Sequence, residues 1–69
     1  MQKIQYINLC ITQFAKKFRM PPRLACNYLR QYQGLAFLDQ YYAAEHTLSL
    51  HDAISDLTQY CKSNGGTLE

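Results

Sequence analysis

The chain is 69 residues long, which is enough for one small domain with a marginal hydrophobic core. Hydrophobic residues make up 48% and charged residues 17%, a balance that excludes an intrinsically disordered segment. Three glycines and two prolines are too few for a fibrous or linker sequence, and the short length excludes most self-contained enzymes, whose clefts need a larger scaffold.

The net charge of +2 conceals a difference between the two halves of the chain. Residues 35–69 contain all five acidic side chains and one basic residue. Residues 1–34 contain no acidic side chain and six basic ones, which are Lys3, Lys16, Lys17, Arg19, Arg23 and Arg30. Such asymmetry either marks a nucleic-acid-binding half or lets the two halves attract each other when they pack. The pI of about 8.5 is below the value of about 9 typical of nucleic-acid-binding modules and favours the second interpretation.

The first predicted helix covers residues 2–18. Apolar side chains recur there at intervals of three and four residues, as on one face of an amphipathic helix. Lys16 and Lys17 fall in its last turn, where cations complement the helix dipole, and the following Pro21–Pro22 pair prevents continuation. The predicted apolar face consists of Ile4, Ile7, Ile11, Phe14 and Phe18, widened by Cys10 and Ala15.

A second helix is expected to begin at Pro22, because proline is tolerated in a first helical turn. We interpret Gly34 as its left-handed stop. The third helix follows Gly34 and ends between Ala43 and His46. The predicted packing faces are Leu24, Ala25, Tyr28, Leu29 and Tyr32 in the second helix, and Leu35, Phe37, Leu38, Tyr41 and Tyr42 in the third.

The last predicted helix begins after Ser49, whose side chain is expected to cap it together with Asp52. Asn64–Gly65 is predicted to end it. Its apolar face consists of Leu50, Ala53, Ile54, Leu57, Tyr60 and Cys61.

No segment alternates with a period of two, so no strand is predicted. We expect an all-α fold: a single small domain of about four short helices, orthogonal or bundle-like, over residues 1–66. Residues 67–69 are expected to form a disordered tail, in which Leu68–Glu69 is interpreted as vector-derived.

The cysteines Cys10, Cys26 and Cys61 are widely spaced and contain no CxxC pair. We see neither a signal-peptide pattern nor an apolar run of about 20 residues that could span a membrane. The sequence therefore predicts a cytoplasmic protein with reduced thiols and no membrane association.

No arrangement of residues points to catalysis or to a cofactor. His46 and His51 are five residues apart with a helix start between them, whereas a helical zinc pair has a spacing of three or four. Cys61 lies on an apolar face, where burial makes a thiol inert. We expect no catalytic residue, no metal site, no cofactor and no enzymatic activity.

Six tyrosines and three phenylalanines are many for so short a chain. Tyr28, Tyr32, Tyr41 and Tyr42 surround the Gly34 turn in the sequence. Amphipathic tyrosine side chains either line an interface or fill a small core with the hydroxyl exposed, and both interpretations stay open.

The segment from Met20 to Tyr42 has the outline of a helix-turn-helix. Its second helix would have to enter the DNA groove, yet it offers only Asp39 and Gln40 as polar tips. The basic first half nevertheless supports an alternative function, a small DNA-binding transcriptional regulator. Its candidate nucleic-acid-binding residues are Lys16, Lys17, Arg19 and Arg23.

The run GLAFLDQYYAAEHTLSLHDAISDLTQYCKSNGG, residues 34–66, resembles the C-terminal half of a family of short bacterial proteins, domain of unknown function 3791. The family pattern is a YG…FL…HY…HT stretch, a helix of the DDI…Y kind and a terminal glycine. Two departures are Gln33, where the family has Tyr, and Pro21–Pro22, where it has a Ser-type cap. The residues at corresponding places are Gly34, Phe37, Leu38, Tyr42, His46, Thr47, Asp52, Ile54 and Tyr60.

This resemblance implies a partner or antitoxin role, because such proteins tend to be encoded beside larger proteins that resemble ADP-ribosyltransferase-type toxins. We interpret the His46–Thr47 pair first as structural, satisfying backbone groups at a helix junction. The primary hypothesis is a non-enzymatic helical protein-interaction module, a monomer or weak homodimer, that binds a protein partner. Its candidate partner-binding residues are Tyr28, Tyr32, Tyr41, Tyr42 and His46.

Overall fold

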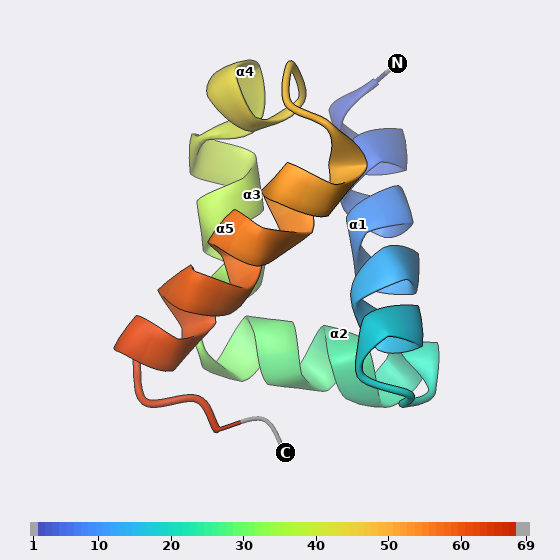
Figure 1. The fold of residues 1–69 in the computed structure, drawn as a ribbon, viewed down its shortest axis with the longest axis vertical. Coiled ribbons are helices and arrows are strands. Elements are labelled where there is room, and N and C mark those ends of the chain that lie inside the picture. Colours follow the sequence, from blue (N-terminus) through green and yellow to red (C-terminus); the bar gives the residue numbers. More distant parts are fainter. Residues whose placement is uncertain (1, 68–69) are drawn as a thin grey trace.

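The computed structural model describes residues 2–67, which form five α-helices and no strand. The helices are α1 (Lys3–Lys17), α2 (Pro22–Gln31), α3 (Gly34–Gln40), α4 (Tyr42–Glu45) and α5 (Leu50–Ser63). Helix α2 lies crosswise at one end of the molecule, and the short α4 lies at the opposite end beside the start of α1 (Figure 1). The all-α prediction is confirmed. The additional helix, α4, lies where the third helix was expected to end. The predicted tail residues Leu68–Glu69 lie outside the described part of the chain.

The ends of the helices mostly follow the local signals in the sequence. Helix α2 begins at Pro22 as predicted, directly after the extended Pro21. The Ser49 side chain accepts a hydrogen bond of 3.2 Å from the backbone N–H of Asp52, which confirms it as the cap of α5. Asn64 follows the last residue of α5, and Gly65 then has a φ of +95°.

The interpretation of Gly34 as a left-handed stop was wrong. Gln33 has the left-handed conformation, with a φ of 68°, and Gly34 is the buried first residue of α3. A β-carbon on Gly34 would lie 2.8 Å from Cδ2 of Leu29 and 2.9 Å from Sγ of Cys61. Glycine is thus needed here because α3 begins in close contact with α2 and α5, not because of its φ angle.

The hydrophobic core lies between α1, α2, α3 and α5, and it uses most of the predicted apolar face of α1: Cys10, Phe14 and Ala15 are buried, and Ile7, Ile11 and Phe18 pack against the core. The buried residues of α1 are centred on Tyr6, Cys10 and Phe14, whereas Ile4 is 67% exposed. Ile4 lies in the first turn of α1, two residues before Tyr6, where the buried part of the helix begins, so this one residue of the predicted face was wrong. Leu24 was also placed on a packing face and is 54% exposed, because Ala25 is the residue that α2 buries there.

Candidate binding groove

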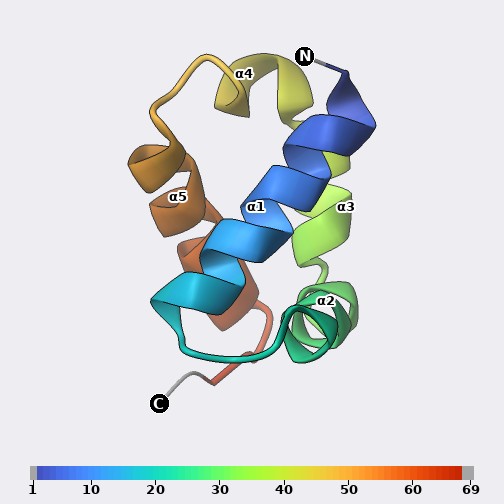
Figure 2. The same cartoon turned by 90° about the vertical axis from the view of Figure 1, so that its right-hand side faces the viewer.

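The four tyrosines that surround Gly34 in the sequence form two separate groups in space. Tyr28 and Tyr32 belong to α2 and its end, and their ring centroids are 4.8 Å apart. Tyr42 begins α4 and stacks on the imidazole of His46 at 4.4 Å. Because α2 and α4 lie at opposite ends of the molecule (Figures 1 and 2), these tyrosines do not make one surface.

The tyrosines also differ in burial. Tyr28, Tyr32 and Tyr42 are half-buried and pack against the core, whereas Tyr41 is 44% exposed. The hydroxyl of Tyr28 is buried without a hydrogen-bond partner in the part of the chain that the structure describes. Tyr28 and Tyr32 therefore have the environment of packing residues, and Tyr41 has that of a surface residue.

The side chains of the His46–Thr47 pair hydrogen-bond to backbone carbonyls of α4. Nδ1 of His46 lies 2.7 Å from the carbonyl oxygen of Tyr42, so this nitrogen is the protonated one that donates. The Thr47 hydroxyl donates to the carbonyl oxygen of Ala44, also at 2.7 Å. Both carbonyls also accept a backbone N–H, from His46 at 3.0 Å and from Thr47 at 3.3 Å, so each side chain adds a second hydrogen bond to an acceptor that is already paired. The expectation that the pair satisfies unpaired backbone groups was therefore wrong, although its contacts are local to the end of α4.

Most basic side chains of the first half have no acidic partner among the described residues. Among residues 2–67 the single ion pair joins Nζ of Lys3 to Oδ1 of Asp39 at 3.0 Å. This pair is the direct ionic contact between the basic first half and the acidic second half in the described part of the chain. The exposed residues at the corner where α1 ends and α2 begins (Figure 1) include Lys16, Lys17, Arg19 and Arg23.

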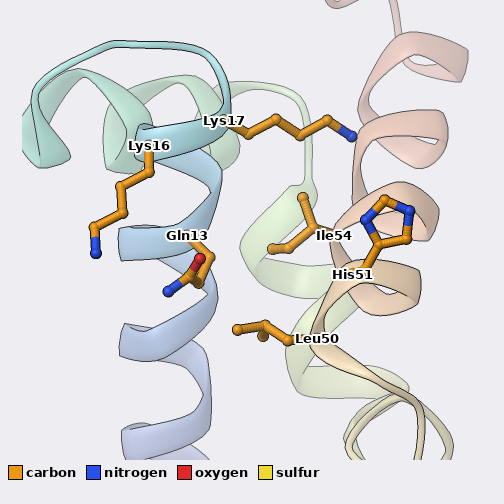
Figure 3. A pocket seen from close by; sticks show the side chains of 6 residues that line it. All are labelled: Gln13, Lys16, Lys17, Leu50, His51 and Ile54. Atoms are coloured by element: carbon orange, nitrogen blue, oxygen red, sulfur yellow. The ribbon is translucent and has the colours of Figure 1, made fainter.

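A groove runs between α1 and the segment from His46 to Ile54. A cavity of about 230 Å³ at one end is lined by Tyr6, Leu9, His46, Leu48 and Leu50. A second cavity, of about 490 Å³, is lined by Gln13, Lys16, Lys17, Leu50, His51 and Ile54 (Figure 3). Leu50 lines both cavities, so they adjoin, and we call the surface that they make together the α1–α5 groove.

The two halves of this groove differ in chemistry. The apolar half contains Tyr6, Leu9 and the 42%-exposed Leu48, with His46 as its polar member. In the basic half, Leu50 and Ile54 form an apolar floor, and Lys17 reaches across from α1 towards α5 (Figure 3). No acidic side chain is among the described residues that line either half.

Helix geometry explains how α1 makes one wall of the groove. The residues of α1 that line the groove follow one another at intervals of three and four, so they form one stripe along the helix. They are Tyr6, Leu9, Gln13 and the Lys16–Lys17 pair. This stripe was not recognisable from the sequence, because it mixes apolar, polar and basic residues.

A buried carboxyl group lies at the α4 end of the molecule and was not anticipated. Glu45 is 8% exposed, and its Oε1 has no hydrogen-bond partner among the described residues. The pKa of Glu45 is raised to about 7, mainly by burial and to a smaller extent by the neighbouring carboxyl of Asp56. Burial also raises the pKa values of Tyr6 and Cys10, to which Glu45 contributes a smaller part.

Two of the three cysteines are buried, and all three are free thiols. Cys61 is fully buried, as its place on the apolar face of the last helix predicted, and burial raises its pKa to about 11. No group of three or more His, Cys, Asp or Glu side chains in residues 2–67 is placed to hold a metal ion.

Residues 5–64 match the family model described as a protein of unknown function, DUF3791. The chain belongs to this family. No curated protein and no solved structure gave a match. The DUF3791 match covers nearly all of α1 as well as the C-terminal half in which the resemblance is specific, and the whole α1–α5 groove lies within it.

Membrane insertion has no support from the helices of this DUF3791 protein. None of them, within the described part of the chain, is long and apolar enough to cross a bilayer.

Proposed function

We propose that this DUF3791 protein is a non-enzymatic, cytoplasmic interaction module that binds a protein partner along the α1–α5 groove. The observation that carries the proposal is the groove itself, where a small domain leaves the apolar side chains of Leu48 and Leu50 accessible beside a stripe of α1. Accessible apolar grooves on small domains are typical places for a partner to bind.

The candidate partner-binding residues differ in their position relative to the groove. His46 lines the apolar half of the groove, and Tyr42 supports it by stacking on its ring. Tyr41 is accessible on the neighbouring α3–α4 junction. Tyr28 and Tyr32 pack against the core and would affect binding through the stability of the fold.

The proposed partner is a larger toxin-like protein encoded beside this one, whose cleft the helical module would cover. Exposed leucines at two places on the molecule give a matched test. Leu48 is 42% exposed in the groove, and Leu24 is 54% exposed on α2 outside it.

The neighbouring protein should be co-expressed with the wild-type chain, Leu48→Asp and Leu24→Asp. We expect a stoichiometric complex that survives nuclease treatment, is lost with Leu48→Asp and persists with Leu24→Asp. Failure of the wild-type chain to form a complex, or equal behaviour of the two variants, would contradict the proposal.

The alternative function, DNA binding, is supported by a different observation. Lys16, Lys17, Arg19 and Arg23 are exposed near one corner and make no ion pair within residues 2–67. Replacing all four with alanine should abolish a salt-dependent gel shift, while Lys62→Ala leaves it unchanged. The absence of any shift at low salt would remove this alternative.

A further inference from the structure

We propose that the α1–α5 groove takes an amphipathic helix of the partner that carries acidic residues at one end. The acidic end lies over Lys16 and Lys17, and the apolar face of the helix covers Leu50 and the apolar half of the groove. This inference rests on the proposed function, because it specifies the partner segment that would occupy the same groove.

The charges around the groove indicate the acidic end. Lys16 and Lys17 are exposed in its basic half and make no ion pair with any described residue. The imidazole of His51 on the facing wall can donate a further hydrogen bond (Figure 3). Since no acidic side chain lines the groove, a carboxylate entering the basic half meets the ammonium group of Lys17 and the imidazole of His51 without a lining carboxylate, while Lys16 adds positive charge from the outer side of α1 (Figure 3).

The apolar half indicates the remainder of the segment. Leu9, Leu48 and Leu50 are only partly buried within the domain, so an apolar side chain inserted between them would remove further apolar surface from water. A uniformly charged ligand gains nothing there. The groove therefore fits a segment whose charge is confined to one end.

The walls of the groove favour a helix over an extended strand. The backbone groups of α1 and α5 are mostly used in their own helical hydrogen bonds, so a strand lying between them would leave its own N–H and C=O groups without partners. A helix satisfies its backbone internally and needs only side-chain contacts. The lining residues span Tyr6 to Lys17 of α1, which at the helical rise is about 16 Å, or three turns of a partner helix.

The test is selection from a phage-displayed library of 16-residue helical peptides, panned against the complete chain. We expect the enriched peptides to carry Asp or Glu in one terminal turn and Leu, Ile or Met at intervals of three and four. Panning against Lys16→Glu/Lys17→Glu should replace the acidic residues of the selected peptides with Lys or Arg.

One selected peptide, made synthetically, supplies the affinity measurement. Its affinity should fall about three- to tenfold with Lys16→Gln/Lys17→Gln, as expected for two partly exposed ion pairs. Lys62→Gln is the matched control, because Lys62 also lies in the last turn of a helix but outside the groove, and it should leave the affinity unchanged. Thermal unfolding of each variant checks that the fold is retained.

The other outcomes separate this inference from the proposed function. If the selected peptides carry an apolar stripe but no acidic residues, and Leu48→Asp no longer binds them, the acidic end of the partner helix is overturned. The groove then remains a protein-binding site. Enrichment that is the same for the wild-type chain and Leu48→Asp would overturn the groove and both proposals. Displacement of an acidic peptide by a short DNA duplex at physiological salt would assign Lys16 and Lys17 to nucleic acid instead.

Discussion

Gly34, the first residue of α3, lies directly against Cys61 of α5. A β-carbon on Gly34 would approach Sγ of Cys61 to 2.9 Å and Cδ2 of Leu29 to 2.8 Å, both too close for ordinary contact. Leu29 and Cys61 are fully buried and have little room to move. The spacing between α2, α3 and α5 therefore depends on the absence of a side chain at one position.

Gly34→Ala should lower the free energy of unfolding by about 1–3 kcal/mol, the usual cost of an extra methyl group in a packed core. Urea unfolding measures the loss. The double variant Gly34→Ala/Cys61→Ala should be less destabilised than the sum of the two single variants, because the smaller side chain at position 61 makes room. Strict additivity would show that the two residues are not in contact.

Glu45 gives the protein a pH-dependent stability. Its pKa of about 7 in the fold is above its ordinary value of 4.5 because of burial and the neighbouring Asp56. The folded state binds the proton of the Glu45 carboxyl group more tightly than the unfolded chain does, so this group contributes its full stabilisation below pH 4.5. The contribution is lost as the pH rises to about 7. We expect a loss of about 1–3 kcal/mol over this interval, measured by urea unfolding at a series of pH values.

The control for this pH dependence is Glu45→Gln, which keeps the shape of the side chain without its charge. It should flatten the pH profile and make the protein more stable than wild type at pH 8. Asp56→Asn should reduce the slope only partly, since burial is the larger cause of the raised pKa. A Glu45→Gln variant with the wild-type slope would contradict the assignment.

The cysteines should differ sharply in reactivity towards a thiol reagent. Cys10 and Cys61 are fully buried and have raised pKa values, whereas Cys26 is partly exposed. We therefore expect one fast thiol in the folded protein, followed spectrophotometrically, and none in Cys26→Ser. Rapid reaction of Cys26→Ser without denaturant would show that the core opens readily.

The parts of the fold that were predictable from the sequence are those determined by neighbouring residues. Pro21–Pro22 ends one helix and starts the next, and Ser49 caps α5 through the N–H of Asp52, a residue three positions away. Such signals act within one turn of a helix and need no knowledge of tertiary packing.

The parts that were missed depend on contacts between segments far apart in the chain. Gly34 was assigned a local role because its contact with Cys61 cannot be seen in the sequence, and Glu45 lies in a four-residue helix that has no periodicity. The α1–α5 groove was missed for the same reason. Lys16 and Lys17 were recognised as basic, but their position beside Leu50 and Ile54 follows only from the packing of α1 on α5.

The position of the buried face on α1 allows the packing itself to be tested. Ile4 and Phe14 both belong to the predicted apolar stripe, but Ile4 is 67% exposed, whereas Phe14 is fully buried and packs on Phe18 and Tyr28. Ile4→Gln should therefore change the free energy of unfolding by less than about 0.5 kcal/mol. Phe14→Ala should cost about 3–5 kcal/mol, enough to abolish cooperative unfolding in a domain of this size. Circular dichroism with urea distinguishes the two outcomes, and a large loss with Ile4→Gln would mean that the first turn of α1 also packs against the core, as the sequence pattern predicted.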